Sequence, residues 1–128
     1  MLFKNSTKKL IVYDTFTGHP QPLSDELDVW GNNMLERYNQ EISQKGSWAA
    51  SSKLSVQSYL TSIYCETSVI QEEISFYSSF ESITEISCLR LDMDWYEPTK
   101  AALDKLYCKM QPRSVLIVDD YGHHSGAR

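Results

Sequence analysis

The chain has 128 residues, a length that fits one domain, and 41% of them are hydrophobic, enough to bury a core. The net charge of −5 and the lack of any stripe rich in Lys or Arg argue against a nucleic-acid partner. No apolar run approaches the roughly 18 residues of a membrane span. Three widely spaced cysteines without a C-x-x-C pair indicate reduced thiols in a cytoplasmic protein.

The first third of the chain predicts a strand followed by a helix. Residues 10–14 (LIVYD) form a short apolar run, which is typical of a strand, and a loop rich in Gly and Pro follows it. Ser24 or Asp25 is expected to cap a helix over 27–38, which would carry its apolar residues at helical spacing.

The rest of the chain is expected to alternate strands and helices. The apolar spacing predicts, in chain order, a helix over 54–64 capped by Ser52, weak strands at 69–70 and 74–77, a strand over 86–91, a helix over 97–110 and a strand over 115–118. The last strand is continuously apolar, as buried parallel strands tend to be, and Cys88 in the strand before it is interpreted as a core residue. This order predicts an α/β fold with a mostly parallel sheet flanked by helices.

Two of the expected strands each end in a pair of carboxylates. Asp92 and Asp94 follow one strand, and Asp119 and Asp120 follow the last. Ligands of an open α/β sheet lie outside the carboxyl ends of its strands, so these four groups should meet at one rim. They repel each other unless a cation, a proton or a basic substrate group lies among them. A shared cation site is therefore expected, the alternative being polar strand ends with Asp94 as a helix cap.

Asp14 closes the first expected strand. It either starts a turn or accepts hydrogen bonds from ribose hydroxyls, and in a parallel sheet it should lie at the same rim as Asp92. His19, His123 and His124 could titrate or bind a metal. His123 and His124 approach the carboxylates only if their loop folds back.

The segments LRLDMDWYEPTKAALDKLY and SVLIVDDYGHHSGAR closely resemble the macrocin O-methyltransferase family, whose pattern contains LRLDxDWYESTK and IVDDYGHxxGAR. YDTFTGHP at 13–20 resembles the DTFxGxP segment of that family. The likeness is strong over 86–128, moderate over 11–22 and weak over 68–85. It implies a Rossmann-like class I methyltransferase fold. It also implies an enzyme that uses S-adenosylmethionine and Mg²⁺ to methylate a sugar hydroxyl of a macrolide or glycan-type acceptor.

The resemblance also implies roles for single residues. Asp92, Asp119 and Asp120 would be metal ligands, Asp94 would be the general base near the acceptor hydroxyl, and Asp14 would hold the ribose of the cofactor. The implied partner is a small sugar-containing molecule, with no membrane or nucleic acid, and a homo-oligomer is compatible with it.

The chain also departs from the family pattern. No glycine-rich turn precedes Lys8, and the strands expected after Arg128 do not follow, so 1–128 are interpreted as a single partial methyltransferase domain, a fragment whose activity is open. Two other interpretations stand beside the first: a non-catalytic remnant or interaction domain, and a metal-dependent glycosyltransferase fragment, because D-x-D also suits a metal diphosphate.

Overall fold

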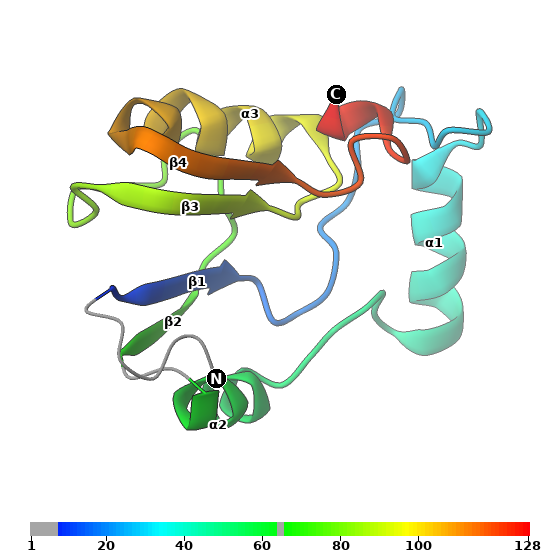
Figure 1. The fold of residues 1–128 in the computed structure, drawn as a ribbon. Coiled ribbons are helices and arrows are strands. Elements are labelled where there is room, and N and C mark those ends of the chain that lie inside the picture. The colour runs from blue at the N-terminus through cyan, green and yellow to red at the C-terminus, as the bar shows by residue number, and fades with distance from the viewer. Residues whose placement is uncertain (1–7, 64–65) are drawn as a thin grey trace. The chain divides into compact units, whose positions relative to one another are not determined.

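The computed structural model describes residues 8–63 and 66–128 (Figure 1). Its elements are, in chain order, β1 (Leu10–Asp14), α1 (Met34–Lys45), α2 (Lys53–Ile63), β2 (Thr67–Gln71), β3 (Ile86–Leu91), α3 (Tyr96–Leu106), the 3₁₀ turn η1 (Tyr107–Lys109), β4 (Met110–Val118) and the 3₁₀ turn η2 (Ser125–Ala127). The expected order of strands and helices is thereby confirmed as a mixed α/β chain with parallel strand pairs.

The chain divides into two compact units, which are described separately. The first holds the residues up to Pro20 together with 41–73, and the second holds 21–40 together with 74–128. Each unit contains one two-stranded parallel sheet, β1 with β2 and β3 with β4. No helix among the described residues is long and apolar enough to span a membrane.

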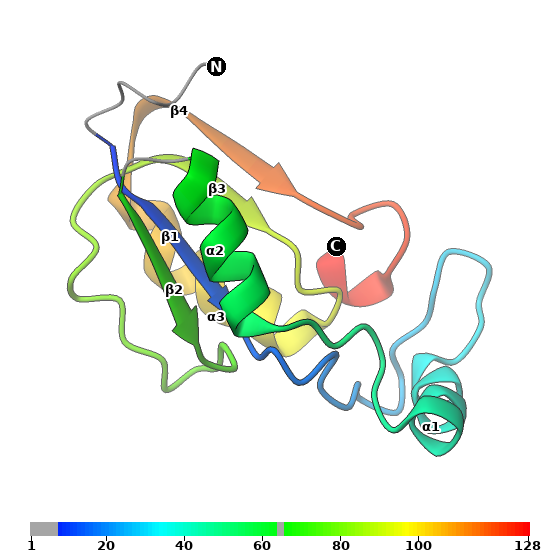
Figure 2. The same ribbon diagram turned by 90° about the horizontal axis from the view of Figure 1, so that it is seen from below.

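In the first unit, α2 packs on the sheet formed by β1 and β2 (Figure 2). The strands pair in register from Leu10 opposite Thr67 to Asp14 opposite Gln71. Ser52 caps α2 as expected, because its hydroxyl oxygen accepts the backbone N–H of Ser55. Asp14 thus stands at the carboxyl end of its strand.

Gly18 allows the loop after β1 to touch the segment before α2. Its φ is 98°, and a Cβ there would lie 2.3 Å from the carbonyl oxygen of Trp48. The backbone N–H of His19 donates to that same oxygen at 2.9 Å, and the rings of His19 and Trp48 pack together. The G-x-P part of the loop therefore serves a close backbone contact that only glycine permits.

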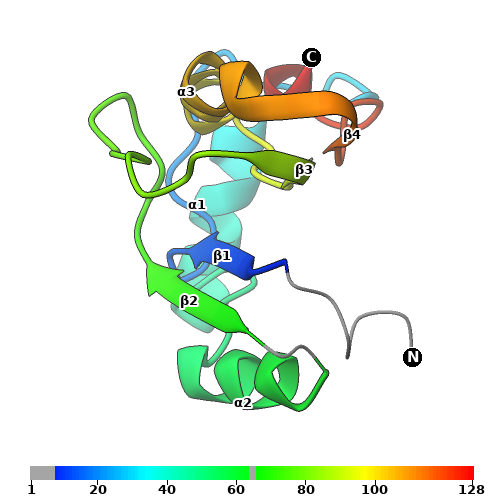
Figure 3. The same cartoon turned by 60° about the vertical axis from the view of Figure 1, so that its left-hand side comes forward.

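In the second unit, α3 lies beside the sheet formed by β3 and β4 (Figures 1 and 3). Its inner face is made of small residues with one large one, namely Thr99, Ala101, Ala102 and Leu106. The helix ends at Leu106 rather than at Met110, because the chain tightens into η1 and then leaves as β4. The register slips between Ile86 and Cys88, where β4 carries extra residues that include Arg113 at a φ of 70°.

The segment before α1 is not the helix that the apolar spacing predicted. The helix begins at Met34, and the side-chain oxygen of Asn33 caps it by accepting the N–H of Glu36. Residues 23–33 instead form a loop, in which the carboxylate of Asp28 accepts the N–H groups of Trp30 and Asn32. A side chain that bonds to the backbone two and four residues ahead competes with a helix at that place.

Two burial expectations for the second unit were wrong. Cys88 is exposed, because Leu89 and Leu91 take the buried face of β3. In β4 the side chains of Val115, Leu116 and Ile117 are also exposed. An apolar strand is buried on both faces only inside a larger covered sheet, and β3 is the one strand that pairs with β4 among the described residues.

Residues 74–85 form a loop and not the second weak strand that was predicted. Two lysines of the α3 region hold this loop by donating to its carbonyl oxygens. Lys105 Nζ bonds Ser78 at 2.6 Å, and Lys109 Nζ bonds Phe80 at 2.7 Å and Ile83 at 2.6 Å. Lysine side chains thus satisfy carbonyl groups of this loop that have no strand partner.

Candidate metal and acceptor site

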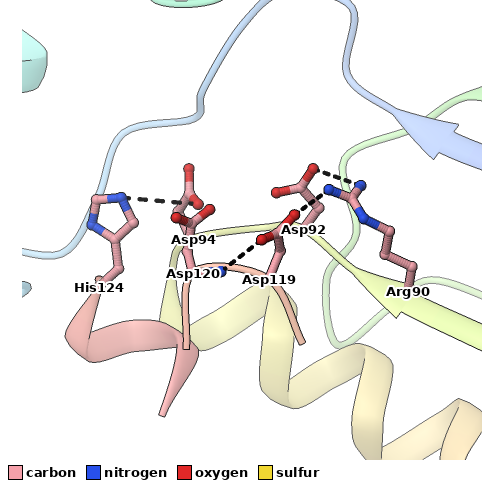
Figure 4. A network of polar contacts seen from close by, with 6 residues as sticks. All are labelled: Arg90, Asp92, Asp94, Asp119, Asp120 and His124. Carbon is pink, nitrogen blue, oxygen red and sulfur yellow. Dashed lines mark hydrogen bonds and ion pairs between the residues drawn. The ribbon is translucent and has the colours of Figure 1, made fainter. Parts of the chain in front are cut away.

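The carboxyl ends of β3 and β4 bring two pairs of carboxylates together in the second unit (Figure 4). Leu91 pairs with Val118 at the end of both strands, and the N–H of Asp119 donates to the carbonyl oxygen of Leu91 at 2.8 Å. Asp92 and Asp119 are the next residues of each strand, so the sheet register places them side by side. We call Asp92, Asp94, Asp119 and Asp120 the carboxylate rim.

Arg90 bridges the two outer carboxylates of the rim. Its Nη1 lies 2.7 Å from Asp92 Oδ2, and its Nη2 bonds Asp119 Oδ2. All three side chains are about half exposed. Burial alone would lower the pKa of Arg90, but the charges and hydrogen bonds of both aspartates outweigh it and raise that pKa above its ordinary value.

The two inner carboxylates stand on strained backbone. Asp94 has a φ of 59° and Asp120 a φ of 52°, in the left-handed region that few residues other than glycine adopt. The turn at Asp94 is closed by the N–H of Trp95, which donates to the carbonyl oxygen of Met93 at 2.5 Å. Such strain persists only where the surroundings hold it, and it is frequent at functional sites.

His124 joins these inner carboxylates to form a cluster of three metal-binding residue types. One potential ligand atom from each of Asp94, Asp120 and His124 lies within 4.8 Å of the others. His124 Nε2 stands 3.9 Å from Asp94 Oδ1, and both side chains are about nine-tenths buried. The loop of His124 therefore folds back onto the carboxylates, which the sequence had left open.

Asp94 holds its proton far more tightly than an ordinary aspartate. Burial is the main cause, followed by a side-chain hydrogen bond with Asp120 and by the negative charges of the other rim carboxylates. Together they raise the pKa of Asp94 from 3.8 to about 7. Asp94 is thus poised to exchange a proton near neutral pH.

A tight turn holds His124 in place. The N–H groups of His123 and His124 donate to the carbonyl oxygen of Asp120 at 2.7 and 3.0 Å. Gly126 then packs against the start of α3, where a Cβ would lie 2.4 Å from the Tyr96 nitrogen and 2.8 Å from the Asp94 carbonyl oxygen. The GAR ending of the motif therefore serves a contact with the backbone that carries Asp94.

The loop before α1 contacts the backbone segments that carry the same site. Glu26 Oε1 accepts the N–H of Tyr96 at 2.8 Å and so caps α3, although 70 residues separate the two. Leu27 exchanges two hydrogen bonds with Ser125, one with its backbone and one with its hydroxyl. Glu26 is buried, and its second oxygen has no hydrogen-bond partner among the described residues.

The four rim carboxylates predicted from the sequence lie near one another, and His124, named as a residue that could titrate or bind a metal, lies beside Asp94 and Asp120. Arg90 and Glu26 were missed. Arg90 left a signal, since it lies two residues before Asp92 and so on the same strand face, whereas the contact of Glu26 left none. Asp14 belongs to the first unit, so its sharing of a rim with Asp92 stays a prediction.

Comparison with known proteins adds the family to this geometry. The family model described as macrocin-O-methyltransferase (TylF) matches residues 2–128. No curated protein and no solved structure gives a match. The family match spans the β3, β4 and YGHHSGAR segments that build the carboxylate rim, and also the loop that contains Gly18. The chain belongs to the macrocin O-methyltransferase family.

Proposed function

We propose that the second unit carries the metal and acceptor half of an S-adenosylmethionine-dependent, Mg²⁺-dependent O-methyltransferase that acts on a sugar hydroxyl. The observation that carries the proposal is the carboxylate rim, where a buried carboxyl with a pKa of about 7 adjoins further carboxylates at the ends of parallel strands. The family match supports methyl transfer as the reaction class.

The donor set of the rim suits a hard divalent cation. Asp92, Asp119 and Asp120 would hold it, since Mg²⁺ prefers oxygen ligands and is commonly bound by carboxylates. A cationic group already lies against two of these residues, namely the guanidinium of Arg90. When bound, the ion would orient the acceptor hydroxyl and lower its pKa.

Asp94 would take the proton of the acceptor hydroxyl as that oxygen receives the methyl group. A general base works best when its pKa lies near the working pH, which burial and neighbouring charges achieve for Asp94. When bound, S-adenosylmethionine would supply the methyl group as part of a sulfonium, and Asp94 would hold the proton that the acceptor oxygen gives up.

Exposed aromatic rings near the rim offer a surface for a sugar ring. Trp30 is 73% exposed, and the centroid of its ring lies 5.1 Å from that of His123. The ring centroids of His123 and His124 are 4.4 Å apart. Tyr96 and Tyr121 are also exposed in this unit. An indole face held this close to the proposed base would bind the apolar face of a sugar.

Asp14 is the proposed ribose contact of the cofactor. Its Oδ1 accepts the N–H of Phe16 at 2.6 Å, which orients the carboxylate at the exposed end of β1.

The metal half of the proposal is tested by calorimetric titration of Mg²⁺ into the chain. Asp119→Ala and Asp120→Asn should each weaken binding by about tenfold or more, a loss of ~1.4 kcal/mol. Asp104→Ala is the matched control, since Asp104 is an exposed carboxylate that pairs with Lys100 on α3. Equal affinities in all four proteins would contradict the proposed ligands.

Two rival functions predict different ligands. A metal-dependent glycosyltransferase would bind a nucleoside diphosphate in the presence of Mn²⁺, and UDP is the probe for it. A non-catalytic domain kept by descent would bind neither UDP nor S-adenosylmethionine. The exposed apolar side chains of β4 favour a role of the non-catalytic domain in binding another protein.

A further inference from the structure

We propose that Arg90 is a resident counter-cation of the carboxylate rim, and that a divalent metal ion enters the rim by displacing it. The metal-free rim would then be held in a paired state, with the guanidinium against Asp92 and Asp119. The identity of the ion rests on the proposed function, whereas the pairing itself is a feature of the structure.

The placement of Arg90 follows from strand geometry. Residues two apart on a strand lie on the same face, so the side chain of Arg90 runs forward along β3 toward Asp92 (Figure 4). The parallel register sets Arg90 opposite Ile117 on β4, so Asp119 comes within reach two residues further on. One guanidinium therefore contacts carboxylates from two different strands.

The two carboxylates do not depend on Arg90 for their position. The strand register and the bond from the N–H of Asp119 to the carbonyl oxygen of Leu91 already set them side by side. Removal of the guanidinium would leave the two carboxylates in place, and the repulsion between their charges would no longer be neutralised. This argues that Arg90 competes with a metal ion rather than building its site.

The pairing is also of a kind that a metal ion can replace. Arg90, Asp92 and Asp119 are about half exposed, and exposed ion pairs contribute little to stability. The arginine side chain is long, so its guanidinium can move into solvent without any change of backbone. A divalent ion presents twice the charge of the guanidinium to the same carboxylate oxygens.

The test is Mg²⁺ binding by calorimetry, with Mn²⁺ binding by electron paramagnetic resonance as a second measure. Arg90→Gln should bind Mg²⁺ about five- to tenfold more tightly, since the ion would no longer have to break the exposed ion pairs of Arg90 with Asp92 and Asp119. Arg90→Lys keeps the charge but loses the guanidinium fork that contacts two carboxylates at once, so its affinity should lie between those of the unchanged chain and Arg90→Gln. Lys100→Gln, which removes an equally exposed charge from α3, should leave the affinity unchanged.

The unchanged chain supplies a readout that needs no variant at Arg90. The Nε–H signal of Arg90 in nuclear magnetic resonance spectra should shift as Mg²⁺ is added, and it should saturate at the same Mg²⁺ concentration as the calorimetric titration. A signal that stays in place while the ion saturates the rim would overturn the inference, whether or not Arg90→Gln folds.

The remaining outcomes separate this inference from the proposed function. Equal or weaker Mg²⁺ binding by Arg90→Gln, with binding still lost in Asp120→Asn, would overturn the counter-cation and leave the metal site standing. Failure of both the unchanged chain and Arg90→Gln to bind Mg²⁺ would overturn both proposals. Binding by Arg90→Gln alone would support displacement in its strongest form.

Discussion

Asp94 combines three features that rarely occur together in one residue. It is buried, it adjoins three other carboxylates, and it sits on left-handed backbone at a φ of 59°. Burial and the neighbouring carboxylates cost stability when Asp94 is charged, and the left-handed backbone costs stability as long as the neighbouring segments of the second unit hold it. A residue so placed is better suited to move a proton than to stabilise the fold.

The raised pKa of Asp94 predicts a specific dependence of stability on pH. Folding raises this pKa from 3.8 to about 7, so the folded chain binds the proton more tightly than the unfolded chain does. The contribution is complete below about pH 4 and is lost as the pH rises through 7. In metal-free buffer, the free energy of unfolding should fall over this range by at most about 1.4 kcal/mol per pH unit from this group.

Asp94→Asn should remove that part of the pH dependence, because asparagine tolerates the left-handed turn and carries no charge. Urea denaturation from pH 4.5 to 8 measures this dependence. The free energy of unfolding of the variant should rise relative to that of the unchanged chain as the pH rises. Asp104→Asn, at an exposed site on α3, should show the same dependence of stability on pH as the unchanged chain. Parallel curves for Asp94→Asn would refute the assignment.

At the scale of the elements, η2 and the loop before α1 lock the start of α3, and both act on its backbone. η2 does so through Gly126, and the loop does so through Glu26. No side-chain hydrogen bond from Trp95, the N-cap residue of α3, caps that helix. The geometry of the Asp94 turn therefore depends on residues far from it in sequence.

Gly126→Ala should destabilise the second unit by about 1–3 kcal/mol, because the new Cβ would overlap the backbone of residues 94–96. Gly122→Ala is the control, since a Cβ there would meet nothing within 4 Å, and its effect should stay within about 0.5 kcal/mol. Urea denaturation of both variants measures the difference. Equal stabilities of the two variants would show that Gly126 does not pack closely against the start of α3.

Glu26→Ala should cost about 1 kcal/mol, the usual loss when a helix cap is removed. Glu26→Gln keeps an oxygen for the N–H of Tyr96 and removes the charge, whose burial raises the pKa of Glu26. The glutamine variant should therefore match or exceed the unchanged chain at pH 7 in the same denaturation experiment. A loss as large as that of Glu26→Ala would mean that the charge itself is needed.

The elements that the sequence predicted well are those whose signal is local. The bounds of β1 and β3 follow from short apolar runs closed by Asp14 and Asp92. The predicted helix over 27–38 begins only at Met34, because the carboxylate of Asp28 organises a loop before it. Contacts such as that of Glu26 with Tyr96 have no periodic signature, since their partners meet only after folding.

At the scale of the whole molecule, the residues proposed for metal binding and for cofactor binding are unequal in number. The carboxylate rim is assembled within the second unit, with His124 and Arg90 around it. The proposed ribose contact, Asp14 at the end of β1, belongs to the first unit. The glycines of the chain stand at 18, 31, 46, 122 and 126, so none precedes β1.

This inequality predicts weak binding of S-adenosylmethionine by the 128-residue chain. The methionine end of the cofactor is expected to rest against a glycine-rich turn, where side chains would block the approach of the backbone. Asp14 alone would supply a ribose contact, so we expect a Kd of about 1 mM or weaker, ~4 kcal/mol of binding, by calorimetry. Asp14→Ala should abolish what remains, while Asp104→Ala should not. A micromolar one-to-one complex would show that other residues of this chain cradle the cofactor.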